Sequence, residues 1–111
     1  MELKKEIVDG LCIITIMADS LEAMNSKTFK DQIAPHLAAN RNLILNFGPV
    51  SFIDSSGCGA LLSCLRQLNA RDGDLKICNA SRPVKTVFEL VRLNRVIEIY
   101  PDCESAVQAF Q

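Results

Sequence analysis

Histidine is almost absent from this 111-residue sequence, in which His36 is the only one. The five cysteines are an odd number and form no C-x-x-C pair, whereas a zinc site needs closely spaced cysteine and histidine ligands. We therefore expect no metal site and no cofactor. Each cysteine lies among apolar neighbours, which favours reduced thiols in the core. These residues are Cys12, Cys58, Cys64, Cys78 and Cys103.

The sequence also lacks a basic cluster and a long apolar run. Its 12 basic and 13 acidic side chains are scattered, with a net charge of -1, so no patch is suited to the phosphate backbone of a nucleic acid. No apolar run approaches the roughly 20 residues that cross a bilayer, and the first residues contain no apolar core of a signal peptide. We therefore expect a cytoplasmic protein without nucleic-acid or membrane partners.

What remains is the composition of an ordinary globular domain. Hydrophobic residues make up 49% and charged residues 23%, which argues against disordered and fibrous classes. A chain of this length can bury a core of its own, and no linker, repeat or low-complexity segment divides it. The sequence therefore predicts a single domain over residues 1–111.

The N-terminal part predicts a β-hairpin followed by an amphipathic helix. Two apolar runs rich in β-branched residues, 3–8 and 11–17, are joined by Asp9-Gly10, a dipeptide typical of two-residue hairpin turns. After a loop, Asn25 or Ser26 can cap a helix. The apolar side chains of this helix recur every four residues, at Phe29, Ile33 and Leu37.

Strands and helices alternate in the rest of the chain. The predicted strands are 43–47, 75–78 and 96–100. The predicted helices are 57–70, a helix that Ser81 caps and a short last helix that Asp102 caps. The helix after Ser81 should bury Val84, Val87, Phe88 and Val91. Strands that alternate with helices after a hairpin are typical of an α/β sandwich with a mixed sheet.

The segment FIDSSGCG joins a predicted strand to a predicted helix, at the end of a strand where open α/β sheets commonly place their sites. Asp54, Ser55 and Ser56 are all good N-cap residues, but one cap explains only one of them. Gly57 and Gly59 cost helix stability unless something approaches the backbone closely. The segment therefore has features that helix capping alone does not explain.

Catalysis by a serine of this segment would need a base within hydrogen-bond reach. The sole histidine, His36, is expected on a helix beside the apolar Leu37, and the segment lacks the G-x-S-x-G order of a nucleophile elbow. Cys58 lacks the same base. We therefore predict no catalytic residue and no enzyme, and keep a hydrolase as an alternative that an active-site serine probe would test.

Phosphorylation of a serine in this segment would have a different effect. Phosphoserine adds about 1.5 to 2 negative charges at pH 7, which the positive end of the helix dipole and its free N–H groups accept. A docked partner would instead have to bury an unmatched dianion, which costs several kcal/mol. One modified hydroxyl can thus switch an interface without unfolding the domain.

The segment LILNFGPVSFIDSSGCGALLSCLRQL resembles the signature of the STAS domain, in particular of bacterial anti-sigma factor antagonists. That signature is a hydrophobic strand followed by D-S-[ST]-G-x-G and a helix. Weaker matches in SLEAMNS, LKICNAS and VKTVFELVRLN extend the resemblance over essentially the whole chain. It implies the STAS fold, an α/β fold whose mixed β-sheet has an N-terminal hairpin and packs against about four helices.

The resemblance implies a switch protein. The unphosphorylated form of such a protein binds an anti-sigma factor, usually a serine kinase, and so releases the sigma factor, and a PP2C-type phosphatase resets the switch. The phosphoacceptor is the hydroxyl residue before the first glycine, here Ser56. Asp54 and Ser55 match the flanking positions, and Gly57 matches the glycine that lets the backbone of a partner approach.

Further residues are expected to bind the partner. Glu22 stands where the family often has Asp, and Asn25 lies in the same matching segment. Cys58 and Leu61 follow the acceptor in the first turns of its helix, where core packing is the favoured role of each and an apolar rim of the docking surface is the alternative. The domain is expected to be a monomer or a weak dimer. The alternative function is that of a STAS structural or regulatory subunit of another complex, in transport or signalling, without phosphorylation.

Overall fold

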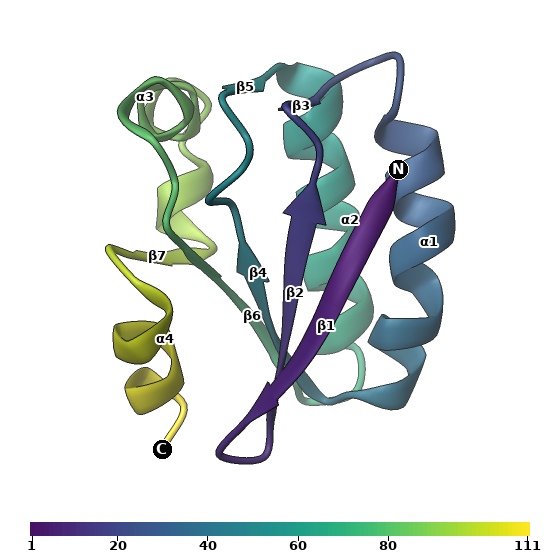
Figure 1. The fold of residues 1–111 in the computed structure, drawn as a ribbon, viewed down its shortest axis with the longest axis vertical. Helices are drawn as coiled ribbons and strands as arrows, with labels where there is room; N and C mark the ends of the chain where they lie inside the picture. Colours follow the sequence, from purple (N-terminus) through teal and green to yellow (C-terminus); the bar gives the residue numbers. More distant parts are fainter.

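A hairpin and parallel crossovers build a five-stranded sheet with helices on both faces (Figure 1). The computed structural model describes residues 1–111. The strands are β1 (Glu2–Val8), β2 (Leu11–Met17), β3 (Ser20–Leu21), β4 (Asn42–Asn46), β5 (Phe52–Ile53), β6 (Asp74–Cys78) and β7 (Glu98–Tyr100). The helices are α1 (Ser26–Ala39), α2 (Ser55–Asn69), α3 (Arg82–Leu90) and α4 (Cys103–Ala109), with a 3-10 turn at Leu93–Arg95. The predicted α/β architecture with an N-terminal hairpin is confirmed.

The order of strands in the main sheet is β1-β2-β4-β6-β7. Only β1 is antiparallel to its neighbour, and the turn residues Asp9 and Gly10 both adopt positive φ, as the hairpin prediction requires. The other strands are parallel. At the upper end of the molecule in Figure 1, where β2 and β4 end, β3 and β5 form a separate two-stranded parallel sheet.

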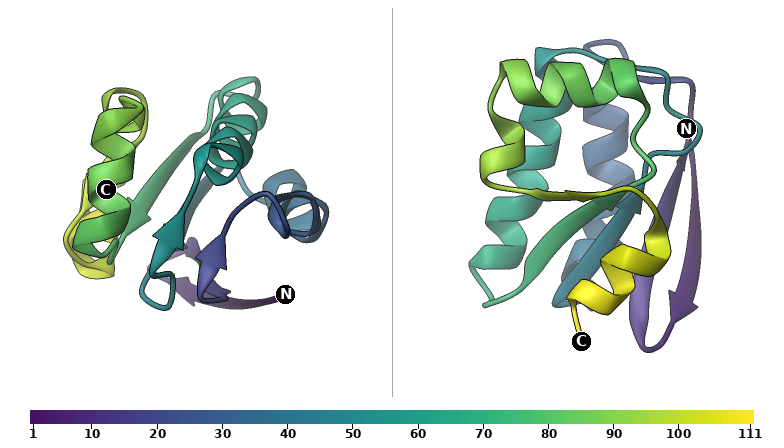
Figure 2. Two further views of the ribbon diagram at one scale, coloured as in Figure 1. Left: turned by 90° about the horizontal axis from the view of Figure 1, so that it is seen from above. Right: turned by 90° about the vertical axis from the view of Figure 1, so that its left-hand side faces the viewer.

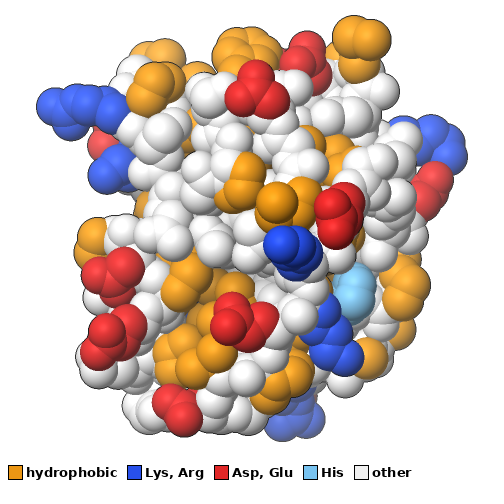
Figure 3. All heavy atoms as spheres, in the orientation of Figure 1, with side chains coloured by type: hydrophobic (Ala, Val, Ile, Leu, Met, Phe, Trp, Pro, Cys, Tyr) orange, Lys and Arg blue, Asp and Glu red, His pale blue; other side chains and the backbone are white.

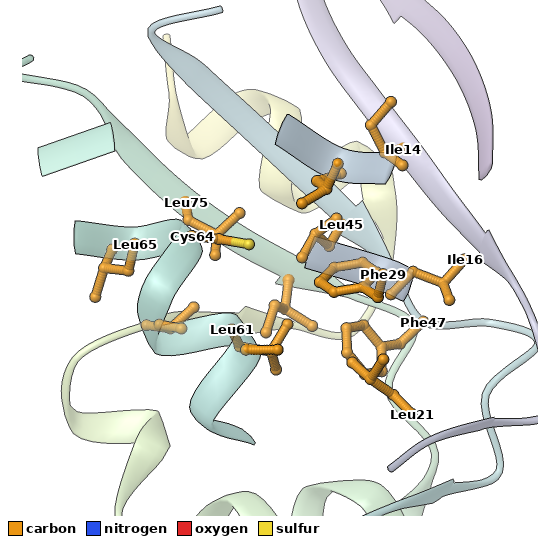
Figure 4. Close-up of a cluster of buried hydrophobic side chains, with 14 of the residues drawn as sticks. Ile14, Ile16, Leu21, Phe29, Leu45, Phe47, Leu61, Cys64, Leu65 and Leu75 are labelled. Carbon is orange, nitrogen blue, oxygen red and sulfur yellow. The ribbon is translucent and has the colours of Figure 1, made fainter. Parts of the chain in front are cut away.

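Successive side chains of a strand point to opposite faces of the sheet, so the buried side chains lie on two faces. Cys12 and Ile14 of β2 join the main core cluster, to which α1, α2 and α3 contribute, whereas Ile13 points to the opposite face. There a second cluster of only five buried residues forms under α4. Figure 2 shows α4 across the sheet from α1 and α2, and Figure 4 shows side chains of the main core.

Three local features differ from the sequence prediction. The predicted strand 96–100 begins only at Glu98, because a 3-10 turn precedes it and leaves Val96 exposed. Val91 is the C-cap of α3 and is exposed, so its predicted core position is wrong, whereas Val84 and Phe88 are buried as expected. The two-residue strands β3 and β5 were not predicted.

The cysteines are not all free. Cys12, Cys58 and Cys64 are buried free thiols, as predicted. Cys78 and Cys103 form a disulfide, so the prediction of reduced thiols is wrong for this pair. The two residues are 25 positions apart in the sequence, and only the fold brings them together.

None of the helices combines the length and the apolar character that a membrane span requires.

Candidate functional site

The FIDSSGCG segment turns from β5 into α2, with Asp54 between them as the N-cap. The Asp54 backbone is extended, and its Oδ1 accepts a hydrogen bond from the Gly57 N–H at 2.9 Å. Such a cap satisfies one of the free N–H groups of the first helical turn. Capping is therefore the role of the acid, and neither of the two serines is needed for it.

The second carboxylate oxygen of Asp54 links α2 to a distant loop. Its Oδ2 accepts a hydrogen bond from the Ala23 N–H at 3.1 Å, across 31 residues of sequence. The pairing of β3 with β5 places these two segments side by side. Asp54 therefore fixes the loop between β3 and α1 beside the start of α2.

Asn25 occupies the N-cap position of α1, but its side chain bonds no helical N–H, so the predicted side-chain cap is absent. Instead Asn25 braces the same loop from inside. Its Oδ1 accepts from the Glu22 N–H and its Nδ2 donates to the Ser20 carbonyl, both at 2.8 Å. Glu22 is partly buried, and its carboxylate makes no hydrogen bond. These two predicted partner-binding residues thus lie beside Asp54, where Asn25 has a structural role.

Ser55 and Ser56 are the first two residues of α2, and both are exposed. Neither hydroxyl takes part in a hydrogen bond of the structure. His36 lies in the last turn of α1, at the opposite end of the helix layer from the start of α2 (Figure 1). It is therefore not placed to activate either serine, whereas both hydroxyls are open to an enzyme that approaches from solvent.

The two glycines of the segment have different surroundings. Gly57 is buried, and a Cβ atom built on it would lie 2.3 Å from the Leu21 carbonyl oxygen and 2.7 Å from Ile53 Cγ1. Glycine is thus required at this position by contact with β3 and β5 inside the protein, not by the approach of a partner. Gly59 is exposed, and a Cβ atom there would meet nothing within 4 Å.

Cys58 and Leu61 face inward. Cys58 is 3% exposed and Leu61 is fully buried, and both belong to the main core cluster. Figure 4 shows Leu61 among the core side chains. Core packing, the role that the sequence favours for both, is confirmed, and neither residue presents surface for an apolar rim. Burial also raises the pKa of the Cys58 thiol, with a smaller contribution from the nearby Asp54 charge, so this thiol stays protonated at neutral pH.

The apolar surface near Ser56 comes from residues that the sequence analysis did not select. Met24, in the loop that Asp54 holds, is 92% exposed, and Phe52 of β5 is 50% exposed. Figure 3 shows hydrophobic side chains along the upper rim of the molecule, near β3 and β5. In the sequence, Met24 is a large apolar residue within a polar loop, and Phe52 is one near the end of an apolar run. These positions indicate a shared surface only once the pairing of β3 with β5 is known.

The family model described as STAS domain matches residues 2–106. The chain belongs to the STAS domain family. The resemblance stated from the sequence is therefore confirmed for the family. The match covers nearly the whole chain, including the β5–α2 junction with Asp54 and the two serines.

Proteins similar to this STAS domain include anti-sigma factor antagonists. The anti-sigma-B factor antagonist of Bacillus subtilis is 23% identical over 92 residues, which cover 83% of this chain and 84% of that protein. The unphosphorylated anti-sigma factor antagonist SpoIIAA is 25% identical, with a TM-score of 0.77 over 97% of this chain and 96% of that chain. The phosphorylated form of SpoIIAA from Bacillus has a TM-score of 0.70 at the same identity, over 99% and 100% of the two chains.

An anion transporter contains a similar fold. The murine Slc26a9 anion transporter is 23% identical, with a TM-score of 0.75 over 91% of this chain but only 18% of that chain. At this identity the likeness concerns the fold alone. The fold thus occurs both as nearly a whole chain and as a small part of a much longer one.

The carboxylate of Asp54 makes the stability of this STAS domain depend on pH. Hydrogen bonds from the Gly57 N–H, and then from Ala23 and Ser56, hold the pKa of Asp54 below its ordinary value. The pKa of Asp54 is lower in the folded than in the unfolded protein. Its charge therefore contributes fully to the free energy of unfolding above the unfolded pKa of about 3.9, and this contribution is lost as the pH falls through the folded pKa. Acid should therefore weaken the junction between α2 and the β3–α1 loop.

Replacing Asp54 by asparagine should reduce this acid sensitivity. We expect the free energy of unfolding of Asp54→Asn to fall less than that of the native protein between about pH 6 and pH 3, because the variant has no charge to lose there. Urea denaturation at stepped pH measures the difference. Hydrogen bonds also lower the pKa values of Asp102 and Glu98. Both proteins should therefore still lose some unfolding free energy as the pH falls. An equal fall of the unfolding free energy with pH in the two proteins would contradict the prediction.

Proposed function

We propose that this STAS domain is an anti-sigma factor antagonist that works by partner switching. Its unphosphorylated form binds an anti-sigma factor that is also a serine kinase, and so releases the sigma factor. Phosphorylation of Ser56 abolishes this binding, and a PP2C-type phosphatase restores it. The domain itself has no catalytic role in this cycle.

The observation that carries the proposal is the exposed Ser56 hydroxyl, free of hydrogen bonds, in the first turn of α2. A phosphate at this position meets the positive end of the helix dipole, so the folded domain tolerates it. The names of two similar proteins, the anti-sigma-B factor antagonist and SpoIIAA, support the role, and SpoIIAA occurs in phosphorylated and unphosphorylated forms.

The surroundings of Ser56 are suited to a partner. Met24 and Phe52 offer apolar surface at the same end of the molecule, and Asp54 and Asn25 hold the segment that carries Met24. A rigid apolar surface loses little conformational entropy on binding. The docking surface that we propose therefore consists of Met24, Phe52, Ser55, Ser56 and Gly59, and leaves out the buried Cys58 and Leu61.

Phosphate mapping tests the proposed acceptor. We expect the native domain, mixed with its cognate serine kinase and ATP, to take up one phosphate, on Ser56. The kinase is to be sought among the products of neighbouring genes. Ser56→Ala should take up none, whereas Ser55→Ala, the matched control in the same helical turn, should be labelled like the native domain. Mass spectrometry of the peptide that contains residues 52–59 reads the site. Loss of label in Ser55→Ala but not in Ser56→Ala would move the acceptor to Ser55.

The second candidate is a STAS subunit that is not phosphorylated. The fold of the Slc26a9 transporter, in which a STAS-like part occupies a small share of the chain, favours it. In that case no kinase labels Ser56, and the native domain is recovered from cells in a stable complex whose composition ATP does not change.

A further inference from the structure

The disulfide between Cys78 and Cys103 joins the sheet to its smallest helix. Cys78 is the last residue of β6, and Cys103 is the first residue of α4. Their Cα atoms are 5.1 Å apart, within the range that a disulfide spans without movement of the backbone. The fold therefore holds these two sulfur atoms in position for bond formation.

The two cysteines differ in exposure to solvent. Cys78 is fully buried, whereas Cys103 is partly exposed and lines a groove between α4 and the hairpin. Figure 3 shows hydrophobic and acidic side chains at the lower left, where α4 and the hairpin lie. Because thiol–disulfide exchange needs access to the sulfur that is attacked, exchange with small thiols must pass through Cys103.

The other three cysteines do not compete for oxidants. Cys12, Cys58 and Cys64 are buried free thiols. Burial raises the pKa of all three thiols, that of Cys64 to about 12. Since the thiolate is the reactive form, these residues stay inert. Oxidation is thereby directed to the one pair that combines a partly exposed cysteine with a bonding partner.

The bond adds a covalent attachment to a helix that otherwise depends on one small apolar cluster. The helix has seven residues, of which only Ala106 and Val107 are buried. A helix this short is not stable alone, so it depends on tertiary contacts. At its far end Phe110 packs against the small cluster under the helix, and the Lys76 ammonium lies 4.5 Å from the centre of the Phe110 ring.

We propose that Cys78 and Cys103 form a reversible redox clip, which fastens α4 to the sheet when oxidised and releases it when reduced. The oxidant is a low-molecular-weight disulfide. The Cys103 thiolate attacks it to form a mixed disulfide and expels one thiolate. The Cys78 sulfur, giving up its proton, then displaces the second small thiol from Cys103. Two protein thiols lose two electrons, and the small disulfide becomes two thiols. The clip does not depend on the proposed function of Ser56.

Thiol counting in glutathione buffers tests the clip. We expect the purified protein, acid-quenched and alkylated under denaturing conditions, to show five free thiols in reduced glutathione and three in oxidised glutathione. A linked peptide pair should contain Cys78 and Cys103. Returning the oxidised protein to reduced glutathione should restore all five. Three results would each overturn the proposal. They are five free thiols at every ratio of reduced to oxidised glutathione, a linkage to another cysteine, and a bond that excess reduced glutathione does not open.

A second measurement separates release of α4 from a general loss of stability. Reduction should lower the Tm by on the order of 10 °C, because it opens the loop that the bond closes across a sequence separation of 25. It should also speed hydrogen exchange in α4 by about 10-fold or more while the amides of α2 change less. Cys103→Ser, or Cys103→Ala if the first variant folds poorly, should resemble the reduced protein under both conditions. A Tm of Cys103→Ser that still responds to reduction would contradict the assignment.

Discussion

Ser56→Asp should bind the cognate anti-sigma factor kinase about 100-fold or more weakly than the native domain. In the free protein the new carboxylate lies in the first turn of α2, where the helix dipole favours negative charge. In the complex the same charge would be buried against the partner, and an unmatched buried charge costs several kcal/mol. Since 1.4 kcal/mol is tenfold in affinity, this cost removes most of the binding.

Binding is measured by titration calorimetry with the kinase and ADP, which avoids phosphorylation during the experiment. Ser56→Ala should bind like the native domain, because the hydroxyl makes no bond that the alanine would lose within the fold. Thermal unfolding of each variant checks that the domain itself is intact. The difference between variants then belongs to the interface.

Ser56→Asn separates charge from size. Asparagine has nearly the shape of aspartate but no charge, so we expect Ser56→Asn to bind much more tightly than Ser56→Asp. Equal loss of affinity in both variants would mean that the site excludes any larger side chain, and native affinity in Ser56→Asp would remove the charge switch altogether. Either result leaves the STAS assignment untouched, because that assignment depends on the family match over residues 2–106.

The order of the main elements could be predicted from the sequence because each has a strong local signal. The Asp9-Gly10 turn, the buried strand at β4 and the Ser81 cap of α3 all follow from residues a few positions apart. The start of α2 was placed two residues late, at 57 rather than at Ser55, because three capping residues in a row leave the boundary open. Local chemistry thus locates the elements and leaves their ends less certain.

The features that were missed depend on contacts between distant segments. Asp54 bonds the Ala23 N–H across 31 residues, and the pairing of β3 with β5 that allows this bond involves only two residues per strand. The sequence predicts Asn25 or Ser26 as the cap of α1, but the side chain of Asn25, the N-cap residue, bonds the preceding loop instead. No periodicity marks such contacts. The acceptor segment was therefore predictable, whereas the loop that frames it was not.

Gly57→Ala should destabilise the domain by about 3 kcal/mol, which lowers the Tm by roughly 10 to 20 °C. The added methyl group would overlap the Leu21 carbonyl oxygen, and Leu21 is held in β3 by its pairing with Ile53. Neither strand can yield without disturbing the Asp54 bond to Ala23. Urea denaturation followed by circular dichroism measures the loss. A change below about 1 kcal/mol would show that the β3–β5 pair moves aside freely.

Gly59→Ala is the matched control, with the same change two residues further along the same helix. Its methyl group meets nothing within 4 Å, so the fold should gain about 0.5 to 1 kcal/mol from the better helix propensity of alanine. Because Gly59 is exposed one turn after Ser56, a partner that packs closely on this turn would meet the methyl group. We therefore expect Gly59→Ala to be more stable than the native domain and to bind the kinase more weakly. Unchanged affinity would place the docking surface away from Gly59, toward Met24 and Phe52 alone.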